Sequence, residues 1–187
     1  MHRPNRRWII PEIRIKGDCE PLINILRGGG GGTHLLGDVL EAIQSYAKGW
    51  ARRWRIGTGG EGHYWRHVKR ERNKVPDALC NWAMDRGGGE WSSEEGLQAL
   101  LGSIQGGSLQ WVGAAFDGGY RAEEGMGAVG FEVLFCSNNN ITILGRYCAR
   151  IRVGEFGSYE AETRACWNAS RVLNELLVRV FSIEAAY

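Results

Sequence analysis

The chain has 187 residues, 43% of them hydrophobic, which suits one domain with a sizeable core. No apolar run approaches the length needed to span a membrane, and residues 1–8 are basic without the apolar stretch of a signal peptide. The five cysteines are scattered and form no CxxC pair, which is typical of reduced core residues. We therefore expect an intracellular protein with neither membrane spans nor a disulfide framework.

The net charge of +2 is distributed unevenly along the chain. Residues 1–90 carry 16 Lys and Arg against 10 Asp and Glu, whereas residues 91–187 carry 7 against 11. Nineteen of the 23 cations are arginine, whose planar guanidinium can bind a phosphate through two parallel hydrogen bonds. This balance favours a polyanionic partner for the first half of the chain.

The first half begins with a strand and two helices. Residues 9–16 predict a strand because apolar and charged side chains alternate at 13–16. Apolar residues at helical spacing then predict helices over about 19–26 and 35–47. Asp18 stands between the strand and the first helix, where an N-cap residue belongs, so a plain helix cap is one interpretation of this residue.

Residues 48–74 form a basic and aromatic stretch with nine Lys and Arg, two Glu, three Trp and a Tyr. Cations interleaved with flat aromatic rings are typical of a nucleic-acid contact surface. A solvated basic face with its aromatic rings in the core is the alternative. Residues 64–69 predict a strand, and a short helix follows with Pro76 in its first turn. The candidate nucleic-acid contacts are Lys48, Arg52, Arg53, Arg55, Arg70 and Asn73.

The second half predicts three strands and a long helix. Residues 85–107 have glycine-rich ends around a short amphipathic helix opened by Ser-Ser-Glu-Glu, and we expect them to be a linker. The run 110–119 is typical of a strand buried on both faces. Strands over 126–135 and 141–153, joined by an asparagine-rich hairpin turn, precede a helix from about 159 to 181.

Two carboxylates of the second half stand at positions that their neighbours would bury. Asp117 ends the apolar run of the first strand, and burying a carboxylate costs several kcal/mol unless a metal ion or an arginine pairs with it. A turn aspartate opening the Asp-Gly-Gly bend is the alternative. Glu162 lies on the apolar stripe of the last helix, whereas Glu160 lies off it and suits a first turn.

These residues resemble the type 1 ribonuclease H family. FDGGYR, GMGAVGFEVLF and YEAETRACWNASRVL resemble the first half of its domain, where an aspartate strand opens a three-strand meander and a helix with an Ala-Glu-x-x-Ala signature follows. The matching carboxylates are Asp117 and Glu162. IKGDCEPLINIL and HVKRERNKVPDALCNWA resemble the second half, especially in the reverse-transcriptase-like branch of plants and retroelements. They supply the third carboxylate at Asp18, the histidine at His67 and the fourth carboxylate at Asp77.

The order of the two halves differs from that of the family. Residues 9–84 resemble the second half of the domain and residues 108–187 the first, with residues 85–107 between them. A circular permutation explains this order, and so does a cut from a tandem array that keeps the tail of one domain and the head of the next. The halves can pack within one chain or between the chains of a half-swapped dimer. Pro76, where the family usually has alanine, is a second difference.

The resemblance implies an α/β fold with a five-stranded mixed sheet flanked by helices. We expect the Asp117 strand to lie parallel to and beside the 13–16 strand, with the 64–69 strand outside the latter. It also implies a metal-dependent endonuclease that cleaves the RNA strand of RNA–DNA hybrids.

Four carboxylates at one site repel one another unless divalent cations lie between them. The resemblance implies two Mg²⁺ or Mn²⁺ ions bound by Asp18, Asp77, Asp117 and Glu162, with Asp117 bridging them. The ions would hold the attacking water and the leaving oxygen during cleavage of the phosphodiester. His67 would assist at the rim of the site, and a histidine that contacts phosphate is the alternative. The alternatives to an enzyme are a catalytically inactive nucleic-acid-binding module and a fragment of a tandem array or retroelement polyprotein.

Overall fold

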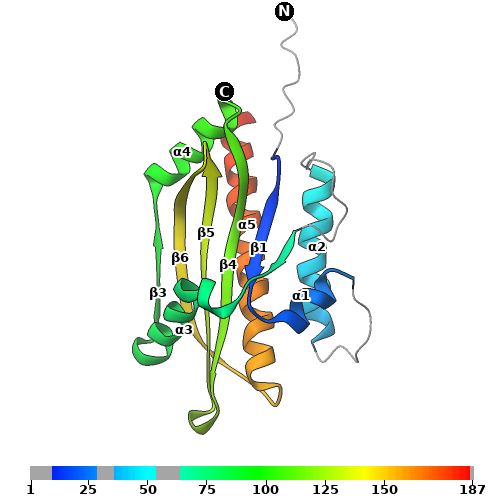
Figure 1. Ribbon diagram of the computed structural model, residues 1–187, viewed down its shortest axis with the longest axis vertical. Coiled ribbons are helices and arrows are strands. Elements are labelled where there is room, and N and C mark those ends of the chain that lie inside the picture. The colour runs from blue at the N-terminus through cyan, green and yellow to red at the C-terminus, as the bar shows by residue number, and fades with distance from the viewer. Residues whose placement is uncertain (1–9, 29–35, 54–63, 186–187) are drawn as a thin grey trace, which may run out of the picture.

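The computed structural model describes residues 10–28, 36–53 and 64–185 as an α/β fold in which helices flank a mixed sheet of six strands (Figure 1). The strands are β1 (Ile13–Gly17), β2 (Trp65–His67), β3 (Gly88–Ser92), β4 (Leu109–Arg121), β5 (Met126–Ser137) and β6 (Asn140–Arg152). The helices are α1 (Glu20–Leu26), α2 (Gly37–Arg53), α3 (Lys74–Arg86), α4 (Glu94–Gln105) and α5 (Gly157–Ala185), with short 3₁₀ helices at Arg70–Arg72 and Ala122–Glu124.

Strand β1 lies at the centre of the parallel part of the sheet. The strand order is β2-β1-β4-β5-β6-β3, and β1 runs parallel to both β2 and β4. The predicted place of the Asp117 strand beside the 13–16 strand is therefore confirmed, and so is the outer place of the strand at 64–69. The two halves of the sequence thus pair directly within one chain.

Strands β4, β5 and β6 form an antiparallel meander. The turn between β5 and β6 contains Asn138 and Asn139, whose φ angles are +49° and +61°. Asparagine tolerates this left-handed backbone better than most residues do, and two-residue hairpins of this twist require it. The predicted asparagine hairpin is confirmed.

The sheet has six strands, so the expectation of five is wrong. The additional strand, β3, pairs antiparallel with β6 at the edge of the sheet and comes from the segment expected to be a linker with a short helix. The short helix is α4, and its N-cap Ser93 accepts a hydrogen bond from the Gly96 N–H at 2.9 Å. The sequence Gly-Gly-Glu-Trp-Ser has neither alternation nor high β-propensity, so pairing with β6 determines this strand.

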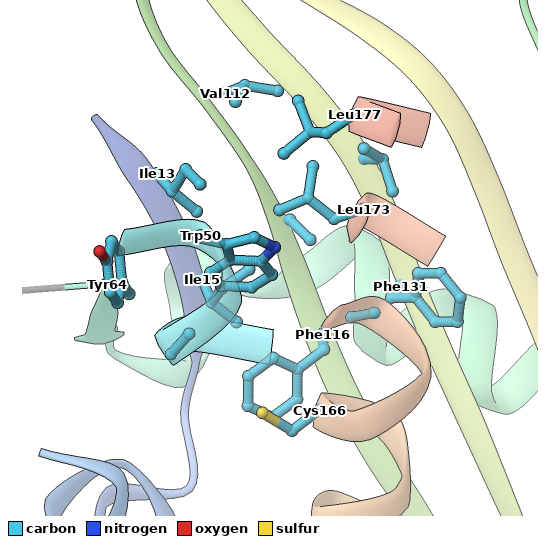
Figure 2. Packing of buried hydrophobic residues seen from close by; sticks show 14 of the residues in the cluster. Ile13, Ile15, Trp50, Tyr64, Val112, Phe116, Phe131, Cys166, Leu173 and Leu177 are labelled. Atoms are coloured by element: carbon cyan, nitrogen blue, oxygen red, sulfur yellow. The ribbon is translucent and has the colours of Figure 1, made fainter. Parts of the chain in front are cut away.

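The main core lies between the sheet and α5, with α2 beside it (Figure 1). The predicted apolar stripe of the last helix is confirmed, because Ala165, Ala169, Leu173 and Leu177 are fully buried. Figure 2 shows Phe116 of β4 next to Cys166 of α5 in this core.

Helix α2 contributes Trp50 to the main core. The indole is fully buried, packs edge-on against Tyr64 at 5.7 Å between ring centroids, and donates a hydrogen bond to Asn174 of α5 at 3.2 Å. A buried indole N–H needs such a partner. This contact joins an element of the first half to the long helix of the second.

Helix α3 packs on the opposite face of the sheet through glycines of β4 and β5. A Cβ atom at Gly130 would lie 2.6 Å from the carbonyl oxygen of Pro76 and 2.8 Å from the amide nitrogen of Cys80. Only glycine allows the helix backbone to come this close to the strand. Pro76 is buried in the first turn of α3, where it is tolerated.

None of the helices in the described parts of the chain is long and apolar enough to cross a membrane. All five cysteines are free thiols, which agrees with the absence of a disulfide framework expected from their spacing.

We predict that Gly130→Ala destabilises the protein by roughly 1–3 kcal/mol, because the added methyl group overlaps the backbone of α3. Gly49→Ala is the matched control, since no atom lies within 4 Å of its added Cβ and it stands inside α2. The control should stabilise by about 0.5–1 kcal/mol. Urea denaturation compares the two, and an unchanged midpoint for Gly130→Ala would contradict the close packing of α3.

Candidate metal centre

The end of β1 brings the first two carboxylates together. β1 pairs in parallel with β4 up to Lys16 opposite Ala115, and two further steps in this register place Asp18 next to Asp117. Because β1 ends at Gly17 while β4 continues, no strand of the described residues pairs with the edge of β4 after Phe116 on that side. The candidate site forms in this gap.

Glu162 enters the same gap from α5. A Cβ atom at Gly118 would lie 2.1 Å from the Glu162 amide nitrogen and 2.2 Å from the Ala161 carbonyl carbon, so only glycine allows α5 this close to β4. The Gly118 N–H donates a hydrogen bond to Glu162 Oε2 at 3.1 Å. Gly118, the first glycine of the Asp-Gly-Gly sequence, therefore allows α5 to pack closely on β4 and orients the Glu162 side chain.

Asp18, Asp117 and Glu162 form a carboxylate triad in which one oxygen from each lies within 4.8 Å of the others. Asp117 is buried within β4, with 7% of its surface exposed, and Asp18 and Glu162 are half-buried. The turn-aspartate interpretation of Asp117 is wrong, because the residue lies inside a strand. The helix-cap interpretation of Asp18 is also wrong, because Cys19 is the N-cap of α1.

Asn73, in the first half of the chain, contacts one member of the triad, Asp18. Its Nδ2 donates hydrogen bonds to Asp18 Oδ1 at 3.3 Å and to the Phe116 carbonyl oxygen at 2.8 Å, on the unpaired edge of β4. The side chain is 1% exposed, so the prediction that Asn73 contacts nucleic acid is corrected. Its Oδ1 is buried without a hydrogen-bond partner among the described residues. Asn73 therefore positions Asp18 and leaves one buried oxygen free.

Asp77, the fourth expected ligand, lies outside the triad. Its Oδ1 faces Arg70 Nη2 at 3.4 Å, and the Asn81 amide contacts its Oδ2 at 3.5 Å. Its negative charge nevertheless contributes to raising the pKa of Asp117. Asp77 therefore stands beside the triad rather than in it.

His67 ends β2 opposite Gly17, the residue before Asp18 in β1. Its side chain is exposed. The role of His67 at the rim of the site, which the resemblance implies, stays a prediction.

The predicted nucleic-acid contacts are only partly described. Lys48 and Arg52 are exposed on α2, and Arg70 is exposed beside Asp77. The side chain of Arg53 and the whole of Arg55 lie outside the described residues.

The triad carries negative charge that the surrounding protein does not balance. Burial, followed by the charge of Asp18, raises the pKa of Asp117 to about 7. Burial, followed by the charge of Asp117, raises the pKa of Glu162 to about 9. The site therefore favours a bound proton or a cation between these groups.

Comparison with protein-family models, with curated proteins and with solved structures gives no significant match. The function of the chain must therefore be inferred from its own residues.

We predict that the metal-free protein loses stability as pH rises from about 4 to about 9. Folded Asp117 keeps its proton up to about pH 7 and folded Glu162 up to about pH 9, whereas the unfolded chain releases both protons near pH 4. The folded state therefore binds more protons than the unfolded state in this range, and its stability falls as pH rises. Asp117→Asn should flatten this dependence and raise Tm at pH 8, by about 2–4 °C for each kcal/mol of repulsion relieved.

Thermal denaturation in chelator at several pH values measures the effect. The matched control is Glu123→Gln, an exposed carboxylate outside the triad in the 3₁₀ helix after β4, which should leave the profile unchanged. A metal-free Tm of Asp117→Asn equal to or below that of the wild type at pH 8 would argue against carboxylate repulsion in the triad.

Proposed function

We propose that this chain is a ribonuclease H-type endonuclease that hydrolyses the RNA strand of RNA–DNA hybrids with two Mg²⁺ or Mn²⁺ ions. The observation that carries the proposal is the convergence of Asp18, Asp117 and Glu162, with oxygens within 4.8 Å of one another. They come from the end of β1, from β4 and from α5. A protein gains no stability from crowding three carboxylates, so such a site suggests a bound cation.

The donor atoms of the site suit Mg²⁺ or Mn²⁺. The triad offers only carboxylate oxygens, and the unpartnered Asn73 Oδ1 is a further oxygen beside it. Hard divalent cations prefer such oxygen ligands, whereas zinc and copper sites favour histidine and cysteine. Asp18, Asp117 and Glu162 are the residues we propose as ligands. We propose Asp77, whose charge acts on Asp117, as a fourth ligand once Arg70 releases it.

The sheet supports the same proposal. Five of its strands, in the order β2-β1-β4-β5-β6, are consistent with a ribonuclease H-like fold, and β3 adds an edge strand. The two halves are joined through β3 and α4 and pair within one chain, which is compatible with a circular permutation.

The ions, when bound, would polarise the scissile phosphate and activate a water molecule for in-line attack. The protein contributes the orientation of the ligands: the Gly118 N–H fixes Glu162, and the Asn73 amide fixes Asp18. We assign to His67, exposed at the end of β2 and opposite Gly17, the exchange of protons with water or with the leaving group. Contacts to 2′-hydroxyl groups would select the RNA strand.

We predict that the protein cleaves an RNA–DNA hybrid only with Mg²⁺ or Mn²⁺ and that chelator abolishes the cleavage. Asp117→Asn should lower the rate by more than about 100-fold, since even partners behind the ligands of metal sites contribute 10- to 100-fold. His67→Ala should slow the reaction without abolishing it, because a rim residue assists but holds no metal. Gel analysis of an end-labelled RNA strand measures the rates.

Glu123→Gln serves as the matched control and should keep full activity, because this exposed carboxylate stands in a 3₁₀ helix after β4. Hybrid cleavage that persists in Asp117→Asn, or that needs no divalent ion, would refute the proposed function. A folded wild-type protein that binds hybrids but never cleaves them would favour an inactive binding module instead.

A further inference from the structure

The face of the sheet that carries α3 is only partly covered. α3 packs against Gly119 of β4 and Gly130 of β5. Further along the same strands, Trp111, Leu134 and Cys136 form a small cluster of their own, against which no other partly buried hydrophobic residue of the described chain packs. These three side chains are only 6–7% exposed, so the longer side chains that lie over them form the surface at this end of the sheet.

Three cations lie at the edge of this open surface. Ile13 and Ile15 belong to the main core, so Arg14 and Lys16 point to the opposite face of β1. Arg66 stands directly opposite Lys16 in the pairing of β1 with β2. Like charges at opposed positions of neighbouring strands repel each other, so this arrangement costs stability.

Among the described residues, Glu12 forms ion pairs with two of these cations, and Glu132, which pairs with Arg146, also attracts Lys16. Glu12 accepts a hydrogen bond from Arg14 Nη2 at 2.7 Å and another from Arg66 Nη2 at 2.9 Å. Lys16 has no ion pair among the described residues, and Arg14 Nε is buried without a hydrogen-bond partner. The cation cluster (Arg14, Lys16 and Arg66) thus keeps an excess of positive charge.

Trp111 holds two of the cations in place. The Arg14 guanidinium carbon lies 4.9 Å and the Lys16 Nζ 4.8 Å from the centroid of its ring. Cations over an indole ring are attracted to its π-system, and this attraction offsets part of their mutual repulsion. The ring itself is only 6% exposed, so the surface that it presents is the pair of charged groups above it.

The cation cluster lies close to the carboxylate triad. The backbone of Lys16 is two residues before Asp18 on β1, and two residues of a strand span about 6.6 Å. Its Nζ lies over the ring of Trp111, six residues before Asp117 on β4, and Arg14 and Arg66 continue the positive charge away from the triad on β1 and β2. A strand of nucleic acid cut at the triad and running along β1 would therefore bring phosphates further along the strand to these cations.

We propose that the cation cluster binds backbone phosphates of the nucleic-acid strand that the triad cuts, on the side of the cut position that lies along β1. This inference rests on the proposed function, since the bound strand is the substrate of the triad. A chain of phosphates suits the cluster better than an isolated anion does, because it can neutralise cations on two neighbouring strands at once. Arginine also matches phosphate oxygens with paired hydrogen bonds.

The test compares the salt dependence of binding between variants. All are made in an Asp117→Asn background, so that a fluorescent RNA–DNA hybrid is bound but not cut. Lys16→Gln/Arg66→Gln removes two cations and keeps the Glu12–Arg14 ion pair. Lys16→Arg/Arg66→Lys keeps both charges. The matched control is Arg171→Gln/Arg179→Gln on α5, which removes two partly exposed arginines that pair with Glu175 and Glu94.

We expect Lys16→Gln/Arg66→Gln to reduce the slope of log affinity against log salt by about two, because each lost phosphate contact removes about 0.9. Lys16→Arg/Arg66→Lys should retain the slope, and so should the control on α5. Single Lys16→Gln should lose about one unit, which guards against a folding defect in the double variant.

An unchanged slope in Lys16→Gln/Arg66→Gln, with the fold intact by circular dichroism, would overturn the phosphate site. Cleavage by the protein with native Asp117 is measured in parallel. If that protein does not cut hybrids while the slope still falls in the variant, the proposed function fails and the phosphate site stands.

Discussion

The short length of β1 is the constraint on which the candidate site depends. β1 stops at Gly17, whereas β4 continues to Arg121, so part of the edge of β4 is left without a neighbouring strand. The Gly118 N–H and the Phe116 carbonyl on that edge bind Glu162 and Asn73 instead of a strand. A longer β1 would pair these groups and close the gap in which the three carboxylates meet.

The triad and the cation cluster place opposite charges at and beyond the end of β1, with the cations on β1 and β2 and the carboxylates after β1, on β4 and on α5. The protein leaves the carboxylates crowded and the cations in excess, although pairing them with each other would stabilise the fold. Such unsatisfied electrostatics are common at functional sites, where a ligand completes the interaction. A nucleic-acid strand bridged to the triad by divalent cations would provide partners for the carboxylates and, through its phosphates, for the cation cluster.

Much of the fold and of the triad follows from the sequence, because apolar periodicity predicts the elements on which Asp117 and Glu162 stand. Their convergence with Asp18 needed the resemblance, since a strand register joining residues so far apart leaves no local signal. The place of Asp77 could not be predicted, because its pairing with Arg70 depends on the side-chain packing of the first turn of α3. Asn73 lies in the segment HVKRERNKVPDALCNWA that resembles the family, but its burial against β4 depends on where β1 ends. β3 was missed because its sequence carries no strand pattern.

The central claim is that the triad binds divalent cations. Crystals of the protein soaked in Mn²⁺, with anomalous scattering recorded at the manganese edge, test this claim most directly. The account predicts anomalous density between the carboxylates of Asp18, Asp117 and Glu162, and its loss in Asp117→Asn crystals. Density elsewhere on the protein, with the three carboxylates hydrogen-bonded to one another and metal-free, would contradict the account.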